Sequence, residues 1–296
     1  MDLNQLRSFC AVARCGSFTQ SAEQEGIAQP SLSRQIQRLE LAVGAPLFER
    51  LGRAVRLTPA GESFLPEAES ILRRVVEAQA KVAETGKGVC GRLRLGVIPT
   101  VMPYWIAPRV RTFFDRFPRL EIRMAEDLTQ HLVSRLQSGE LDMAVASLPV
   151  HNPEIVCSEL FPEPLLLAVP GDHPFCRVAR VDLRDLARER LLLLKEGHCL
   201  RNDVLTACTR ARAEFKSVFE TDHLASIFAL VTSGFGVSII PHMAAGSAVG
   251  CRLIPLAQNS VRRIGYLRAR RHFLSRAMKE FTVWLRASIP SPAEPR

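Results

Sequence analysis

Apolar residues near the start of the chain recur at the spacing of helices. A first helix is predicted from the apolar series Leu3, Leu6, Phe9, Cys10 and Ala13, and this helix should end at Gly16 and Ser17. A short second helix over about 19–25 ends at Gly26. A third has Pro30 in its first turn and Leu32, Ile36, Leu39 and Val43 on one face, opposite Ser33, Arg34 and Gln37. This pattern predicts a helix-turn-helix, but a three-helix bundle with a solvated polar face would show the same periodicity.

The next segment, LFERLGRAVRLTPAG, predicts a short hairpin and the start of a long helix. The hairpin carries Arg50, Arg53 and Arg56, whose side chains suit phosphate contacts, and Thr58 and Pro59 suit the first positions of the helix. Along that helix, apolar residues repeat at intervals of four and three: Phe64, Ala68, Ile71, Val75, Ala78 and Val82. A seam of this length predicts pairing with a second copy of the chain, and a dimer would present two recognition helices to a pseudo-palindromic operator.

After the glycine-flanked hinge GKGVCGR, predicted strands alternate with helices. The helices fall over 103–116 and in QHLVSRLQSG, and the strands are RLRLGVI, LEIRMAE, LDMAVAS, PLLLAVP, LLLLK, GVSIIP and RIGYL. The alternation predicts α/β units with mostly parallel sheets. Ligands of such folds bind beyond the carboxyl ends of the strands, which indicates Thr100, Thr129 and the loop after LLLLKEG.

Charge and composition narrow the class of protein without locating a site. The formal net charge is +9, but residues 1–90 carry only +1 of it, so bulk charge does not identify a nucleic-acid surface. With no apolar run of about 18 residues and no secretory signal pattern, we expect a soluble protein of the cytoplasm. The eight cysteines should then be reduced, and any disulfide would be a switch. The common nucleotide- and metal-binding motifs do not occur, so we expect no metal and no organic cofactor.

Two cysteines nine positions apart, Cys199 and Cys208, lie in a segment that predicts a helix. Cys199 should lie at its N-terminus, where the helix dipole, His198 and Arg201 would favour a thiolate. If residues 199–208 stay helical, the two Cα atoms are ~13 Å apart, beyond the roughly 7 Å that a disulfide tolerates, so bond formation would require the helix to melt. Two buried structural cysteines are the alternative interpretation.

The N-terminal segment FCAVARCGSFTQSAEQEGIAQPSLSRQIQRLELAVGAPLFER, followed by LTPAG, resembles the DNA-binding domain of LysR-type transcriptional regulators. The resemblance covers about the first 60 residues. It implies a recognition region of Gln29, Ser31, Ser33, Arg34 and Gln37, with Arg34 and Gln37 on base edges and Arg50 and Arg53 on phosphates.

The same resemblance implies the architecture of the whole chain. We expect an α/β protein with a winged helix-turn-helix domain over 1–58, a dimerisation helix over 59–88 and a two-lobed effector domain, similar to periplasmic binding proteins, over 89–296. Lobe I would comprise about 91–161 and 266–296, and lobe II about 162–265. DNA, further copies of the chain as a dimer or tetramer, and RNA polymerase are the implied partners, with no membrane.

The segment LLLLKEGHCLRNDVLTAC closely resembles the sensor segment of the peroxide-sensing members of this family, and VIPTVMPYWIAP, GDHPF and VTSGFGVSIIP also resemble their counterparts. The resemblance implies that Cys199 reacts with hydrogen peroxide and Cys208 resolves the product. Thr100, Thr129 and His198 would line the peroxide pocket, beside Arg201 and Asn202. One departure is Asn202, which stands where these regulators commonly have Asp. The other six cysteines are interpreted as structural.

The resulting hypothesis is a regulator of antioxidant genes, not an enzyme. One alternative is a regulator of the same fold that binds a small carboxylate between its lobes, with the cysteines incidental. A thiol peroxidase is the other, but it leaves the first 90 residues without a role. Steady-state turnover with excess thiol would separate a catalyst from a switch.

Overall fold

The computed structural model describes residues 1–51, 54–83 and 88–290. The chain divides into two compact units, Met1–Gly86 and Lys87–Arg296. Within the described ranges, no helix is both long and apolar enough to cross a membrane.

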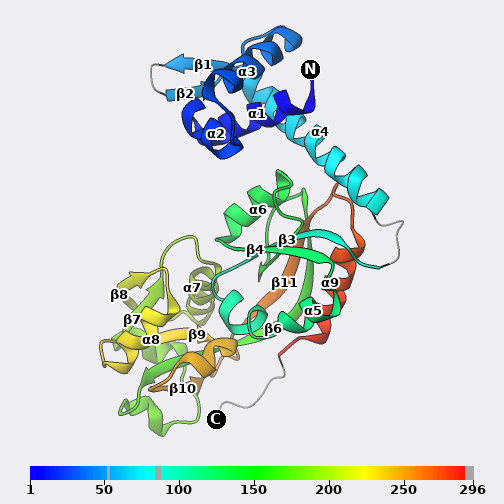
Figure 1. Ribbon diagram of the computed structural model, residues 1–296. Helices are drawn as coiled ribbons and strands as arrows, with labels where there is room; N and C mark the ends of the chain where they lie inside the picture. The colour runs from blue at the N-terminus through cyan, green and yellow to red at the C-terminus, as the bar shows by residue number, and fades with distance from the viewer. Residues whose placement is uncertain (52–53, 84–87, 291–296) are drawn as a thin grey trace. The chain divides into compact units, whose positions relative to one another are not determined.

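The first unit consists of three short helices, a hairpin and a long helix. In chain order the elements are α1 (Leu3–Cys15), α2 (Phe18–Glu25), α3 (Gln29–Val43), β1 (Phe48–Leu51), β2 (Ala54–Leu57) and α4 (Pro59–Ala83) (Figure 1). Gly16 and Gly26 end α1 and α2 in the left-handed conformation, which glycine adopts at little cost. Leu32, Ile36 and Leu39 of α3 are buried in the common core. The predicted helices and wing are therefore confirmed, with α3 following α2 after a tight turn.

The long helix α4 begins as predicted. The Thr58 hydroxyl accepts a hydrogen bond from the Gly61 N–H at 3.0 Å, and Pro59 is the first helical residue. The N-terminal half of the predicted dimer seam packs within its own domain, because Ala68 is fully buried in the core and Phe64 and Ile71 pack against it. Ala68 therefore cannot contact a partner helix in this fold. Val75, Ala78 and Val82 remain as the predicted interface, and residues 84–87 lie outside the described residues.

The effector unit contains two separate hydrophobic clusters, which define two lobes. Lobe I contains β3 (Gly91–Val97), η1 (Met102–Ile106), α5 (Arg111–Arg116), β4 (Leu120–Glu126), α6 (Thr129–Gln137), β5 (Met143–Leu148) and α9 (Arg276–Ala287). Lobe II contains η2 (Pro174–Arg177), η3 (Leu183–Arg188), β7 (Arg190–Leu194), α7 (Cys199–Ala211), β8 (Lys216–Thr221), α8 (Leu224–Thr232), β9 (Ser238–Pro241), η4 (His242–Ser247) and β10 (Cys251–Pro255). Two long strands, β6 (Ile155–Pro170) and β11 (Val261–Ala269), run between the lobes (Figure 1).

The sheets are mixed, so the expectation of mostly parallel pairing is wrong. Along the sheet the strand order is β10-β6-β11-β5-β3-β4, with β9 also paired to β6. β3 pairs in parallel with β4 and β5, as does β7 with β8, whereas β6 and β11 pair antiparallel with each other and with their other neighbours. The chain enters lobe II along β6 and returns along β11, and two strands that carry it in opposite directions must run antiparallel.

The predicted helix over 103–116 is broken. A π-helical turn, η1, is followed by turns and then by the short α5. Trp105 is fully buried in lobe I, and its indole N–H donates to the Ser288 carbonyl at 2.7 Å. Packing of this large side chain against the C-terminal segment accompanies the irregular helix.

Candidate functional site

The exposed face of α3 carries polar side chains of the predicted DNA-reading set. Gln29, Ser31, Arg34 and Gln37 are exposed, whereas Ser33 is half-buried. The apolar residues Leu32, Ile36 and Leu39 of α3 fill the core, so these polar side chains face away from it. That exposure is what the predicted reading of base edges requires. Of the two arginines predicted to contact phosphates, Arg50 is in β1 and Arg53 lies outside the described residues.

Cys199 is the first residue of α7, as predicted. The chain leaves β7 and turns at Gly197, whose φ of 95° favours glycine, and His198 is the N-cap residue. The buried face of α7 consists of Leu200, Val204 and Cys208, which pack in lobe II. The Cys199 side chain instead packs against the lobe I cluster and keeps some exposed surface. The reactive candidate therefore lies between the two lobes.

Burial raises the pKa of the Cys199 thiol, contrary to the expectation of a lowered one. The guanidinium of Arg262, the Ser147 backbone and the Thr129 hydroxyl each lower that pKa, while the charge of Asp203 raises it. The arginine whose charge favours a thiolate here is thus on β11 and not in the segment that contains Cys199.

Thr129 is the first residue of α6. Its buried Oγ1 has no well-formed hydrogen bond to another described residue. The same hydroxyl is near enough to the Cys199 thiol to lower its pKa. A buried hydroxyl with unused bonding capacity can bind a small polar molecule beside the sulfur.

Thr100 belongs to a fully buried network around Arg262. The Arg262 Nε donates to Glu163 Oε2 at 2.6 Å, Nη1 donates to Thr100 Oγ1 at 2.7 Å, and Nη2 donates to the Thr100 carbonyl at 3.2 Å. Glu163 Oε1 accepts from the Met243 N–H at 2.8 Å. The network joins β6 and β11 to the loop after β3, and it fixes the guanidinium that acts on Cys199.

His198, Arg201 and Asn202 do not supply the electrostatics expected of them. The Arg201 Nη1 donates to the Leu194 carbonyl at 2.9 Å and to Glu220 Oε1 at 2.7 Å. The buried His198 has its Nε2 at 3.4 Å from Asp222 Oδ1. Neither residue is among the groups that shift the pKa of Cys199, and Asn202 is exposed. Their part in a peroxide pocket stays a prediction, but the first turn of α7 is tethered to β7 and to the end of β8.

Cys208 lies on the far side of the same helix. It is 1% exposed in the lobe II core, where burial raises the pKa of its thiol. Nine residues at 100° each place it ~180° around α7 from Cys199, in addition to the ~13 Å of helical rise. All eight cysteines of the chain are free thiols. The pair is therefore separated by an intact helix, as expected.

The chain matches two family descriptions. Residues 3–62 match the bacterial regulatory helix-turn-helix protein of the lysR family, and residues 86–290 match the LysR substrate binding domain. The chain belongs to the LysR family. It is 34% identical over 244 residues to the DNA-binding transcriptional dual regulator OxyR of Escherichia coli K12. The matched region covers 82% of this chain and 80% of that protein.

Two solved structures also resemble this LysR-family regulator. One is a full-length OxyR variant from Pseudomonas aeruginosa, with 31% identity and a TM-score of 0.78; the match covers 100% of this chain and 97% of the Pseudomonas chain. The other is a cysteine-to-serine variant of Corynebacterium glutamicum OxyR bound to H2O2, with 31% identity and a TM-score of 0.64; the match covers 97% of this chain and 94% of the Corynebacterium chain. The regulator is therefore an OxyR-like, DNA-binding member of the family.

Four residues around Cys199 in this LysR-family regulator were missed by sequence reasoning: Ser147, Glu163, Asp203 and Arg262. Ser147 follows the predicted strand LDMAVAS at its carboxyl end, a position that could have been found. Asp203 lies four residues after Cys199, on the same face of a helix. Glu163 and Arg262 carried no sequence signal, because they approach the site only through the pairing of β6 with β11.

A cavity of about 340 Å³ adjoins the site. Its lining includes Leu148 and Pro149 of lobe I, Asp203 and Arg210 of α7, and Arg263. Residues from both lobes thus meet at this cavity, and its arginines suit an anion.

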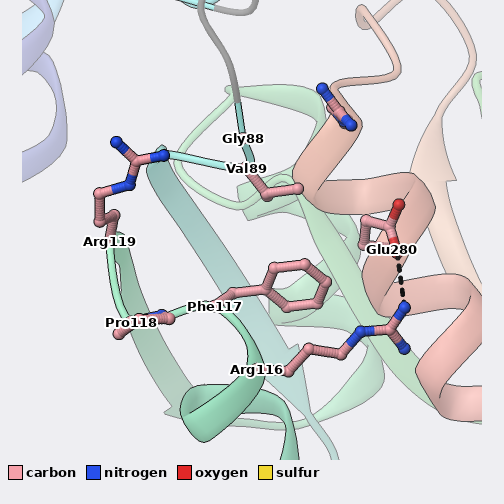
Figure 2. Close-up of a pocket in the computed structure, with 8 residues that line it drawn as sticks. Gly88, Val89, Arg116, Phe117, Pro118, Arg119 and Glu280 are labelled. Carbon is pink, nitrogen blue, oxygen red and sulfur yellow. Dashed lines mark ion pairs between the residues drawn. The ribbon is translucent and has the colours of Figure 1, made fainter.

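A second hollow, of about 370 Å³, lies at the start of β3 (Figure 2). Arg116 forms an ion pair with Glu280 at 3.9 Å across it. Gly88 has a φ of 102°, a backbone conformation that favours glycine, where the chain enters the effector unit. This position belongs to the predicted hinge GKGVCGR, whose first two residues lie outside the described ones.

Proposed function

We propose that this LysR-family regulator senses hydrogen peroxide through Cys199 and controls antioxidant genes in the bacterial cytoplasm. The observation that carries the proposal is the surrounding of Cys199, where Arg262 stabilises a thiolate and the buried Thr129 hydroxyl has bonding capacity for a small oxidant. The related OxyR variant solved with H2O2 supports the choice of ligand.

The chemistry consists of two balanced steps. The Cys199 thiolate attacks one peroxide oxygen, the O–O bond breaks, and the departing hydroxide takes a proton to give water and a sulfenic acid. The Cys208 thiol then displaces the hydroxyl of the sulfenic acid as water and forms a disulfide. Thr100, Thr129 and His198 would orient the oxidant, as the resemblance implies.

The second step is what converts oxidation into a change of shape. The two sulfurs lie on opposite faces of α7, and Cys208 is buried in lobe II, so the bond requires α7 to unwind and Cys208 to leave the core. A helix of 13 residues has little stability without tertiary packing. Unwinding also breaks the contacts of Arg201 with Glu220 and Leu194, which couples the thiol to lobe II.

In this proposal α3 reads DNA as part of a dimer or tetramer, and the remodelled effector domain alters contacts with DNA and RNA polymerase. The protein is a switch that turns over once per oxidation, not an enzyme. The exposed residues of α3 support DNA reading, and the remaining apolar residues of α4 support pairing.

The test is a DNase I footprint on a target promoter, with and without peroxide. Wild-type protein should change its footprint on oxidation, Cys199→Ser should keep the reduced footprint, and the control Cys157→Ser, which removes an exposed thiol, should behave as wild type. A peroxide-dependent footprint in Cys199→Ser would contradict the proposal.

The cavity beside Arg210 and Arg263 favours one second candidate, a small carboxylate effector bound between the lobes. In that case Cys199→Ser would respond normally to the effector, and Arg210→Gln would not respond.

A further inference from the structure

Asp203 shares a face of α7 with Cys199, one turn further along the helix. Its Oδ2 accepts a hydrogen bond of 2.9 Å from the Ser147 hydroxyl. The backbone of the same serine is near enough to the Cys199 thiol to lower its pKa, and Ser147 is 4% exposed. One buried residue at the end of β5 thus holds the Asp203 carboxylate and also lies beside the thiol.

The charges around Asp203 come from each element packed against it. Burial raises the pKa of the Asp203 carboxyl and outweighs the Ser147 hydrogen bond and the charge of Arg262 on β11, which both lower it, while Glu163 of β6 raises it further. Arg210 and Arg263 line the adjoining cavity. Asp203 is therefore a stronger base than an exposed aspartate, next to a thiol that holds its proton more firmly than usual.

We propose that Asp203 is the acid–base residue of the peroxide reaction, accepting the Cys199 proton and delivering it to the departing hydroxide. The inference rests on the proposed function of Cys199. The S–H bond breaks and an O–H bond forms on Asp203, so that the thiolate can attack. As the S–O bond forms, the O–O bond breaks, its electron pair goes to the distal oxygen, and the Asp203 proton completes a water molecule. Sulfur is oxidised, peroxide is reduced, and no outside proton is needed.

This assignment accounts for the departure at Asn202. Asn202 lies on the exposed face of α7, where a carboxylate would face solvent, whereas Asp203 faces Ser147 and Cys199. In this chain the acidic residue next to the Leu-Arg pair has moved by one position, to the face that carries the thiol.

The experiment compares two reactions of Cys199 in the full-length Cys208→Ser protein, with Asp203 or Asp203→Asn. One reaction is oxidation by H2O2, measured by dimedone trapping and mass spectrometry. The other is alkylation by iodoacetamide, whose leaving iodide needs no proton. Asn can still accept the Ser147 hydrogen bond, so packing is kept. The matched control, Glu214→Gln, removes an exposed carboxylate just beyond α7.

Asp203→Asn should slow the peroxide reaction by about 10²-fold, the usual contribution of general acid–base catalysis. It should leave alkylation unchanged or faster, because the charge of Asp203 raises the pKa of Cys199. With Asp203 present, the peroxide rate should be flat between the pKa values of Asp203 and Cys199, whereas the Asn variant should rise with pH over that range. Asp203→Glu, which keeps a carboxylate, should retain the flat profile and part of the rate.

Two outcomes would overturn the inference alone. One is an equal loss of both reactions, which would mean that Asp203 does not deliver a proton to the departing hydroxide. The other is a peroxide rate and pH profile unaffected by Asp203→Asn. If Cys199 gains no sulfenic acid even with Asp203 present, the proposed function itself fails, and the inference fails with it.

Discussion

Replacement of Arg262 by Met should destabilise the effector unit strongly. The guanidinium and its partner Glu163 are 0% and 3% exposed, and their contact is 2.6 Å. Arg262→Met removes this ion pair and both bonds to Thr100, which leaves the Glu163 carboxylate buried with the Met243 N–H as its remaining bond among those described. Breaking a buried pair by removing one partner costs about 3–5 kcal/mol of unfolding free energy.

Urea unfolding followed by tryptophan fluorescence measures this loss in the relevant unit. The two tryptophans of the chain, Trp105 and Trp284, are both buried in lobe I. The matched control is Arg263→Met, because Arg263 is 54% exposed and its contact with Glu159 is 3.8 Å. That variant should lose less than about 1 kcal/mol. Adding Glu163→Leu to Arg262→Met should restore most of the stability, since no charge is then left buried.

A loss of unfolding free energy below about 1 kcal/mol for Arg262→Met would contradict this expectation, because it would mean that Glu163 is neutralised or hydrated at little cost. The buried Arg262 guanidinium would then contribute little to stability, and its role would be its effect on the Cys199 thiol.

Three further predictions concern the other parts of the chain. Arg34→Ala should weaken specific DNA binding by about 1–3 kcal/mol and relax sequence preference, whereas Arg53→Ala should weaken binding to specific and random DNA alike. Binding titrations with both DNAs measure this, and equal losses of affinity for Arg34→Ala would show that Arg34 does not read bases. Val75→Glu should yield monomers by light scattering while the neighbouring Val76→Glu stays dimeric, and an unchanged mass for Val75→Glu would place the dimer interface elsewhere. Burial raises the pKa of Cys10 to about 12, so at pH 8 iodoacetamide should label the exposed Cys157 well before Cys10 in the native protein, and equal rates by mass spectrometry would contradict that burial.

The elements that could be predicted from the sequence are those that local residues determine. Gly16 and Gly26 end helices, and Thr58 with Pro59 begins one, because capping involves only neighbouring residues. The direction of the sheet could not be predicted in this way. It depends on β6 and β11 carrying the chain between lobes, and the alternating pattern of strands and helices does not contain that information.

In the candidate site, too, the sequence predicts what neighbouring residues determine and not what distant elements contribute. Cys199 at the start of α7 follows from its own segment, but its electrostatics come from distant elements. The charge of Arg262 acts on the thiol from β11, whereas the neighbouring Arg201 binds Glu220. Ala68 shows the same limit in the first unit, because periodicity identifies an apolar face without saying whether its own domain or a partner covers it.

Non-reducing peptide mapping with amide exchange, on wild-type protein treated with one equivalent of H2O2, tests the redox switch most directly. We expect a peptide that links Cys199 to Cys208, together with faster exchange across 199–211 than in reduced protein, because the bond cannot form over an intact α7. Oxidation of Cys199 without that link, or a link with unchanged exchange in α7, would contradict the proposed switch.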